Sequence, residues 1–376
     1  MNAVRVCGIG TATPAGSFAQ ETAIPLAAAR CCSSERERLW LERIYRASGV
    51  QRRGSVLLDA EDSASSIEAF YPPRTSFADR GPGTAERLAR YAREAGKLAA
   101  RACESALGDA AVEPSRITHL VTVSCTGLFS PGLDAELIAQ LGLPRHVGRL
   151  NLGFMGCHGA LNGLHAASAL ARSVPDARVL LCCVELCSLH FCYGWNPQQV
   201  VANALFADGA AAAILSPAGE ARLQLQDTAS LLTQDSTDAM TWRIGDHGFE
   251  MGLSLEVPKR IRASLRDWLE PWLASHALRI DDVAHWAIHP GGPEIIQAAI
   301  DSLGIPDQAG DVSRAVLAEH GNMSSPTVLF ILQRMCAQGA TGAIVALGFG
   351  PGLMFEAALF DSPRAFTASA RFPSPA

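Results

Sequence analysis

The chain has 376 residues, of which 48% are hydrophobic, and its formal net charge is -6. This length and apolar content supply a large buried core, more than one ordinary domain uses. The lysines and arginines are scattered and form no basic stripe that could neutralise nucleic-acid phosphates, so a nucleic-acid partner is not expected.

The N-terminus leads into a short apolar strand and lacks the basic region and apolar core of a signal peptide. No uncharged apolar run is long enough to span a bilayer, so we expect no membrane insertion and a cytoplasmic protein. The chain has 11 cysteines, an odd number, and several lie in apolar runs, where cysteine behaves as a small hydrophobe. Reduced thiols are therefore expected instead of a disulfide framework.

The first half of the chain alternates apolar runs with helical patterns. Polar residues 59–83 separate a short N-terminal unit from a helical stretch over Thr84–Asp109. Further on, the predicted strands cover Ile117–Val123, His146–Leu152, Val179–Leu186 and Ala210–Leu215, and the predicted helices cover Leu133–Leu143 and Ala160–Ala171. This alternation indicates an α/β protein with largely buried sheets.

The second half repeats the scheme less clearly. Its predicted elements are a helix over Val257–His276, a strand over Ala284–His289, helices near Pro293 and Ser325, and strands over Gly342–Leu347 and Leu353–Phe360. Residues 209–223 do not read as a flexible linker, because the apolar run there is continuous. We predict two related halves, residues 1–216 and 217–376, that share one rigid core.

Cys157 is the first candidate for chemistry. It lies in the glycine-rich segment Asn151–Gly159, which joins an apolar strand to a helix and permits a tight turn. Free N–H groups and the positive end of the helix dipole lower the pKa of a thiol there, and the thiolate is the reactive form. A small residue packed at a strand–helix junction is the structural alternative, so partner residues have to decide.

Two further segments supply candidate partners. His289 ends a strand just before the stiff loop Pro290–Pro293, and side chains at such loop ends project into sites. A histidine hydrogen-bonded at the edge of the core is the alternative. Asn322 stands directly before an apolar helix and, taken alone, is as well explained as a helix cap.

Together, Cys157, His289 and Asn322 with their flanking residues resemble the chalcone synthase superfamily, the type III polyketide synthases, over nearly the whole chain. The segments Ala204–Ala211 and Gly348–Leu353 extend the resemblance. It implies a thiolase fold of five αβαβα layers, in which the N-terminal half carries the cysteine and the C-terminal half carries the histidine and asparagine. It also implies an acyltransferase that forms a homodimer.

In the implied reaction, Cys157 accepts an acyl group from a coenzyme A (CoA) thioester and holds it through rounds of extension. Malonyl-CoA loses carbon dioxide, and His289 and Asn322 donate hydrogen bonds to the oxygen of the resulting enolate. The carbanion attacks the thioester, and the extended chain cyclises to a pyrone, a resorcinol or a related aromatic product. By resemblance, His289 also keeps Cys157 ionised during loading.

The resemblance places further residues around the substrate. Phe206 matches the gatekeeper between the entry tunnel and the initiation cavity, although core packing is its plainer explanation. Met251 stands where plant enzymes have a second gatekeeper phenylalanine, and Trp242 replaces a glycine. The other matched cavity positions are Cys125, Thr126, His190 and Ser324. The thioether of Met251 favours a fatty acyl starter over a phenylpropanoid one.

For CoA binding, Arg43 aligns with a residue that contacts the phosphates in plant relatives, with Arg46, Arg52 and Arg53 as possible substitutes for missing lysines. The expected partners are acyl-CoA, malonyl-CoA and a second copy of the chain. We expect no tightly bound cofactor and no metal. Ser130 occupies the position from which plant relatives insert a methionine into the partner's cavity, so that contact stays open.

Two alternative functions share these residues. A papain-like cysteine peptidase has the same catalytic order, but the flanks of Cys157 lack the peptidase pattern and no disulfide framework accompanies them. A ketoacyl synthase III that initiates fatty-acid chains also has all three residues. Its histidine typically precedes Gln-Ala-Asn, whereas His289 precedes Pro290.

Overall fold

The computed structural model describes residues 3–58 and 64–362. Three segments lie outside the described part: residues 1–2 and 363–376, at the outer ends of the two predicted halves, and residues 59–63 of the predicted polar stretch. Within it, nine strands form one continuous sheet in the order β11-β12-β13-β8-β1-β7-β6-β4-β5. The junction is short, because β1 pairs with β8 only from Val4 to Val6.

The strand order repeats on the two sides of this junction. From β1 (Val4–Ala12) outward come β7 (Asp208–Ser216), β6 (Val179–Leu186), β4 (His119–Ser124) and β5 (Gly148–Gly153). From β8 (Leu223–Leu232) outward come β13 (Met354–Ser362), β12 (Gly342–Gly350) and β11 (His285–Ile288). When the strands of this sheet are counted along the chain within each part, both parts have the same order outward from the junction: first, last, last but one, second. The first part has β5 as an additional strand at its outer edge. The repeat fits two related sheets that are joined at one edge.

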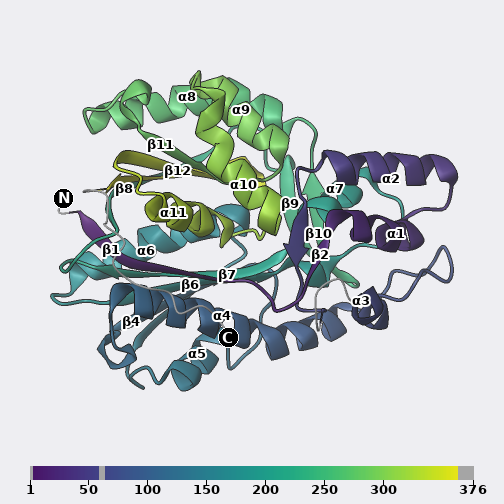
Figure 1. Cartoon of the computed structure of the whole chain (residues 1–376), viewed down its shortest axis with the longest axis horizontal. Helices are drawn as coiled ribbons and strands as arrows, with labels where there is room; N and C mark the ends of the chain where they lie inside the picture. Colours follow the sequence, from purple (N-terminus) through teal and green to yellow (C-terminus); the bar gives the residue numbers. More distant parts are fainter. Residues whose placement is uncertain (1–2, 59–63, 363–376) are drawn as a thin grey trace.

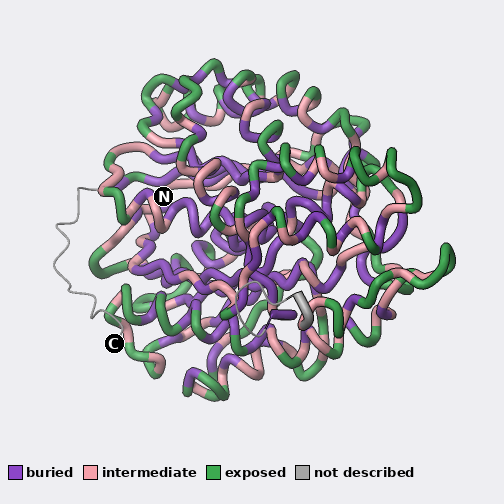
Figure 2. Tube along the Cα trace, turned by 45° about the vertical axis from the view of Figure 1, so that its right-hand side comes forward, coloured by how far each residue is buried: buried purple, intermediate pink, exposed green. Residues whose placement is uncertain are grey.

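Helices cover the sheets in three layers, which Figure 1 shows from top to bottom. The outer pair α4 (Thr84–Ala110) and α5 (Leu133–Leu141) packs on β4, β6 and β7, and the outer pair α8 (Val257–Ser275) and α9 (Pro293–Leu303) packs on β11–β13. Between the sheets lie α6 (Gly159–Ser173) and α11 (Thr327–Ala337), whose side chains share one core cluster with strands from both parts. This is the five-layered thiolase fold predicted above, and Figure 2 shows its buried interior and exposed rim.

The predicted strands and helices agree with these elements to within a few residues, but several elements were not predicted. They are β8, α1 (Gln20–Cys31), α2 (Glu35–Ala47), α7 (Pro197–Leu205), α10 (Asp311–His320), the hairpin of β9 (Met240–Gly245) and β10 (Gly248–Leu253), and the short β2 (Ser17–Ala19), β3 (Arg52–Gly54) and α3 (Ala64–Phe70). Most of them gather at one end of the layers in Figure 1, where they enclose the cavities described below. No described helix combines the length and the apolar character that crossing a membrane requires.

Glycines in β1 allow α4 to lie directly on the sheet. A Cβ atom at Gly10 would stand 2.2 Å from the backbone nitrogen of Ala106 and 2.3 Å from the carbonyl oxygen of Ala102. Gly10→Ala is therefore expected to lower the free energy of unfolding by about 1–3 kcal/mol or more. Gly108→Ala, in the same helix but facing open space, is the control and should leave stability unchanged or raise it by about 0.5–1 kcal/mol. Thermal unfolding of both variants tests this, and equal losses would disprove the close-packing explanation.

Candidate active site

Cys157 lies in a single tight turn, residues Gly156–His158, between β5 and α6. Gly156 has φ +77°, and a Cβ atom there would stand 2.4 Å from Cδ of Pro351. Only glycine fits this position, which is the tight turn that the sequence predicted. The Cys157 side chain is 7% exposed, so it faces a cavity and not bulk solvent.

His289 follows β11 directly and is held by its backbone. Its N–H donates to the carbonyl of Leu347 in β12 at 2.8 Å, and its own carbonyl accepts from Gly291 at 3.0 Å. Both ring nitrogens are buried, and neither has a hydrogen-bond partner among the described residues. The predicted alternative of a histidine bonded at the core edge is therefore wrong, and the ring is free to bind a ligand.

Asn322 is fixed through its carbonyl oxygen. Its Oδ1 accepts from the backbone N–H of Ser324 at 2.8 Å, so its Nδ2 is left as a donor. The helix α11 begins only at Thr327, and its N-cap is Pro326, so Asn322 is not the helix cap that its sequence position also suggested. Its backbone pairs on both sides of Phe206, donating to Leu205 at 2.9 Å and accepting from Ala207 at 2.9 Å.

Two adjoining cavities contain the predicted site residues. The smaller cavity is lined by Cys157, His289 and Asn322 together. The larger has about 1070 Å³ of empty space, part of it open to solvent. It is lined by all seven predicted pocket residues: Cys125, Thr126, His190, Phe206, Trp242, Met251 and Ser324. Cys157, Phe206 and Met251 line both cavities, so both predicted gatekeeper positions lie where the two spaces meet.

Burial controls the charge of the two central groups. Burial raises the pKa of the Cys157 thiol to about 11, and the charge of Glu185 also raises it. Hydrogen bonds with Ser324 and Asn322 lower this pKa but do not offset the effect of burial. Burial therefore outweighs the lowering of this pKa that the sequence analysis expected from the helix terminus. Burial also lowers the pKa of His289 to about 3, and the nearby His158 acts in the same direction. A neutral thiol and a neutral imidazole result.

The thiol pKa makes a prediction about alkylation. At pH 7 a thiol with a pKa of about 11 holds about 10⁻⁴ of its molecules as thiolate, so removal of its proton by His289 should dominate its reactivity. We expect iodoacetamide to modify Cys157 in His289→Ala at least about tenfold more slowly at pH 7 than in the wild type. The rate in the variant should rise steadily with pH toward 11, because only hydroxide then removes the proton. His247→Ala, an exposed histidine, is the control, and equal rates in His289→Ala and wild type would contradict the base role.

Glu185 is a site residue that the sequence analysis missed. It is fully buried, and its carboxylate accepts from the backbone N–H groups of Cys125 and Thr126, from the Thr126 hydroxyl at 2.7 Å and from the Ser325 hydroxyl at 2.6 Å. Burial still raises its pKa. Its signal in the sequence was a single acidic residue inside the apolar run Val179–Leu186. Since the Thr126 hydroxyl also accepts from Leu186, it shapes the wall and has no hydrogen left for a substrate.

The predicted pocket residues His190 and Trp242 form an aromatic wall with Phe249. The His190 Nε2 donates to the Thr126 carbonyl at 2.6 Å, and its Nδ1 accepts from the Phe249 N–H at 3.0 Å, so neither nitrogen is free for a ligand. The Trp242 indole donates to the Cys125 carbonyl at 2.6 Å. His190 stacks on Phe249 at 4.3 Å, and Trp242 meets both rings edge-on. Trp242 thus fills space, as its replacement of a glycine predicted.

The arginines proposed for CoA binding differ in position. Arg43 is exposed on α2 and lines neither cavity. Arg46 forms ion pairs with Glu21 and Glu42. Arg53 is only 5% exposed and lines the larger cavity, so its suggested role as a surface phosphate contact is wrong.

Comparison with known families finds matches along most of the chain. A model described as chalcone and stilbene synthases, N-terminal domain, matches residues 2–218, and the corresponding C-terminal domain matches residues 224–363. The chain is 30% identical, over 94% of its length and 90% of the relative, to an alpha-pyrone synthesis polyketide synthase-like protein, Pks18, of Mycobacterium tuberculosis. It is 32% identical, over 93% of its length and 91% of the relative, to a 1,3,6,8-tetrahydroxynaphthalene synthase of Streptomyces peucetius.

Solved structures give the same result. The type III polyketide synthase domain of Steely1 from Dictyostelium superposes with a TM-score of 0.87 at 27% identity, over 96% of this chain and 99% of that chain. A polyketide synthase of the brown alga Ectocarpus siliculosus superposes with a TM-score of 0.86 at 31% identity, with the same coverage. These matches favour the predicted polyketide synthase over the ketoacyl synthase and peptidase alternatives.

Proposed function

Because the chain belongs to the chalcone and stilbene synthase family and is a type III polyketide synthase, we propose that Cys157 is its acyl-carrying nucleophile and that His289 and Asn322 stabilise the enolate. The observation that supports these roles is the meeting of all three side chains on one small cavity beside a large one. We keep the proposed division of the chain into two halves: residues 1–216 contain the thiol of Cys157, and residues 217–376 contain the two donors, His289 and Asn322.

In the loading step, the thiol of Cys157 attacks the carbonyl of an acyl-CoA, and its proton moves to a ring nitrogen of His289. The acyl–sulfur bond to CoA breaks, a new thioester forms on Cys157, and CoA leaves as a thiol after taking up the proton. Neither ring nitrogen of His289 has a hydrogen-bond partner in the described part of the chain, so one of them is available to accept this proton. The exposed Arg43 is proposed as a contact for the CoA phosphates.

In the extension step, malonyl-CoA loses carbon dioxide, and the remaining electron pair forms an enolate. The Nδ2 of Asn322 and one N–H of His289 donate to the enolate oxygen, where preorganised donors in a dry cavity are most effective. The neutral state of His289, caused by its burial, leaves one ring N–H for this purpose. The carbanion then attacks the carbonyl carbon of the Cys157 thioester, and the bond between that carbon and the Cys157 sulfur breaks. The extended chain is now a CoA thioester, and the Cys157 sulfur is released for another round of loading. We propose that this step needs no tightly bound cofactor and no metal, because two donors suffice to stabilise the charge.

The activity is tested by incubating the purified protein with a panel of acyl-CoA starters and malonyl-CoA, and by identifying products by mass spectrometry. We expect release of free CoA and a pyrone, resorcinol or related aromatic product for at least one starter. All 11 cysteines lie within the described residues and are free, which supports our proposal of a cytoplasmic location.

We also propose a homodimer that forms through β5. This strand lies at the edge of the sheet, and beside it Leu150, Phe154 and Met155 are each 38–39% exposed. An exposed edge strand with apolar neighbours is a template for pairing with another chain. The predicted position of Ser130 near the partner is exposed in this chain, so it is free to reach a second copy.

The dimer makes a prediction about mass in solution. Leu150→Asp is expected to shift the protein from dimer to monomer in sedimentation equilibrium, because it places a charge at the centre of the proposed contact. Val174→Asp, an equally exposed residue (39%) at the end of α6, is the control and should remain dimeric. A monomeric wild-type protein, or a dimer that tolerates Leu150→Asp, would contradict the β5 contact.

A further inference from the structure

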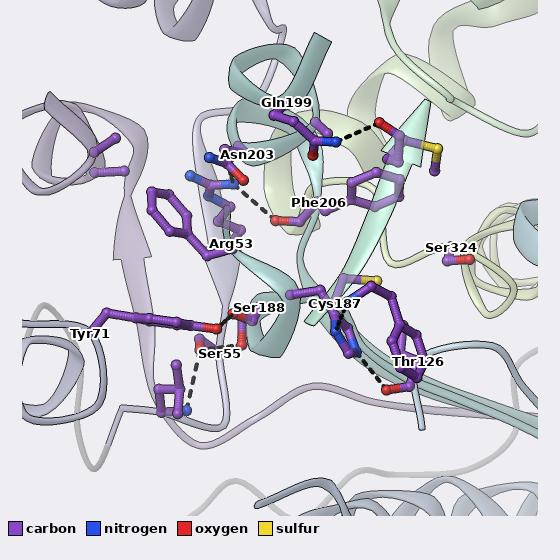
Figure 3. Close-up of a pocket in the computed structure, with 18 of the residues that line it drawn as sticks. Arg53, Ser55, Tyr71, Thr126, Cys187, Ser188, Gln199, Asn203, Phe206 and Ser324 are labelled. Atoms are coloured by element: carbon purple, nitrogen blue, oxygen red, sulfur yellow. Dashed lines mark hydrogen bonds between the residues drawn. The ribbon is translucent and has the colours of Figure 1, made fainter. Parts of the chain in front are cut away.

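The larger cavity continues beyond the acylation site into a second arm. Its walls there are made by α1, by the two-stranded β2–β3 sheet and by side chains from α2 and α7. Figure 3 shows Ser324 and Thr126 at one side of this cavity and Tyr71 and Ser55 at the other, with Phe206 and Cys187 between them. We call the part lined by Phe18, Leu26, Arg30, Tyr45, Arg53 and Tyr71 the far arm.

Arg53 is a buried cation in the wall of the far arm. Its Nη1 donates to the carbonyl oxygens of Asn203 at 2.6 Å and Phe206 at 2.9 Å, and its Nε has no partner of hydrogen-bond geometry among the described residues. The guanidinium also interacts with the Tyr45 hydroxyl. The bond to Phe206 ties the guanidinium to the backbone of the gatekeeper position, as Figure 3 shows. Arg53 therefore lies next to this position in the wall of the larger cavity.

Tyr45 adds a second unused donor to the same wall. It is fully buried, and its ring lies 5.7 Å from Cζ of Arg53. Its hydroxyl oxygen interacts with the Arg53 guanidinium, and its O–H hydrogen has no acceptor among the described residues. A buried polar group without a partner is costly, by about 1–3 kcal/mol. An O–H donor without an acceptor, beside a buried guanidinium in the same cavity wall, indicates a ligand that accepts hydrogen bonds there.

Charge shows what kind of ligand this is. Arg30, Arg53 and Arg87 are all at least 95% buried, and none of them forms an ion pair with a described carboxylate. Their hydrogen bonds go to carbonyl and hydroxyl oxygens, and no described Asp or Glu lines the cavity. Burial lowers the pKa of Arg53, and the charge of Asp208 acts in the opposite direction. The Asp208 carboxylate, however, accepts its hydrogen bonds from Val56 and Ser188 and forms no ion pair with Arg53. An anion in the far arm would offset this unpaired positive charge.

We propose that the far arm holds the end of the starter acyl chain, and that Arg53 and Tyr45 select a starter that ends in a carboxylate. The apolar walls at Phe18 and Leu26 suit the methylene chain that precedes this end. This inference rests on the proposed acylation of Cys157, and it narrows the expectation of a plain fatty acyl starter. The starter class is that of dicarboxylic acids joined to CoA through one of their two carboxyl groups.

The test compares pairs of acyl-CoA substrates of equal length. Succinyl-, glutaryl- and adipoyl-CoA are each matched with the analogue in which an isopropyl group replaces the terminal carboxylate. Acylation of Cys157 is followed by intact-mass spectrometry in the absence of malonyl-CoA, so only the loading step is measured. For at least one pair we expect the carboxylate substrate to acylate the wild type about tenfold faster than its analogue or more.

Tyr45→Phe is the informative variant, because the hydroxyl that it removes donates no hydrogen bond to any described residue. It should keep the thermal stability of the wild type and lower acylation by the carboxylate substrate about tenfold, with little change for the analogue. Arg53→Lys should retain part of the preference, whereas Arg53→Met should lose it. Because Arg53 also ties two carbonyls together, the result for Tyr45→Phe stands if the Arg53→Met protein does not fold.

The outcomes separate this inference from the proposed function. If isopropyl-ended or other plain acyl-CoA substrates acylate Cys157 at least as fast as all three carboxylate substrates, the inference is overturned and the acyltransferase stands. If Tyr45→Phe slows both members of a pair by the same factor, the hydroxyl has a structural role and the proposed selection is wrong. If no acyl-CoA acylates Cys157, the proposed function itself fails, and the inference with it.

Discussion

Replacement of Cys157 by alanine should abolish transfer of a radiolabelled acyl group from acyl-CoA to the protein and reduce product formation at least about 10³-fold. The reason is chemical: the thioester that carries the growing chain can form only on this sulfur. Decarboxylation of malonyl-CoA should persist in the variant, because that step needs the donors of His289 and Asn322 and not the thiol.

Cys336→Ala provides the matched control, since this half-buried thiol lies in α11 and lines neither cavity. It should label and turn over like the wild type. Peptide mapping of the labelled wild-type protein should find the acyl group on Cys157. Wild-type labelling of Cys157→Ala would mean that another cavity thiol, Cys125 or Cys187, carries the acyl group instead.

The complementary result is expected for the two donors. His289→Ala and Asn322→Ala should each reduce malonyl-CoA decarboxylation by about 10²–10³-fold, the usual loss when one preorganised donor to a developing oxyanion is removed. Asn322→Asp should be no better than Asn322→Ala, because a carboxylate offers the enolate no donor and repels its charge. Release of labelled carbon dioxide measures this step directly.

The two donors should also differ from each other. His289→Ala is expected to lose loading as well as decarboxylation, whereas Asn322→Ala should still accept an acyl group on Cys157, because only the imidazole takes up the thiol proton. Thermal unfolding checks that each variant is folded, and His247→Ala should match the wild type in both steps. Decarboxylation at the wild-type rate in both donor variants would remove the proposed enolate-stabilising role.

Much of the fold was predictable because its buried strands are short apolar runs between glycine- and proline-containing turns. The run Val179–Leu186 coincides with β6, and the position of Cys157 between a strand and a helix followed from local pattern alone. The strand β8 was missed because one of its faces is polar, so Leu223–Leu232 does not form a continuous apolar run. The helix α1 was missed because Pro25 interrupts an alanine-rich segment that has little polar contrast.

For the site, residue identities were predictable and their electrostatics were not. The flanks of Cys157, His289 and Asn322 singled out these residues, yet the pKa of the thiol depends on how much water the fold removes. The same holds for Arg53, whose sequence context suggested a surface cation. In the fold it lies in β3, buried against the rings of Phe18 in β2 and Tyr45 in α2. Local sequence reports which groups are present, while burial by distant segments decides their charge and their free hydrogen bonds.

The backbone pairing of Asn322 with the residues on either side of Phe206 has a consequence for changing the starter range of this enzyme. Phe206, the predicted gatekeeper, and Asn322, the proposed amide donor, belong to one backbone-paired unit, so an insertion or a shift in this loop would misplace both residues together. Side-chain substitutions at residue 206 alter the width of the passage and leave that unit intact. The entrance can thus be widened or narrowed independently of the chemistry, provided that the main chain is left as it is.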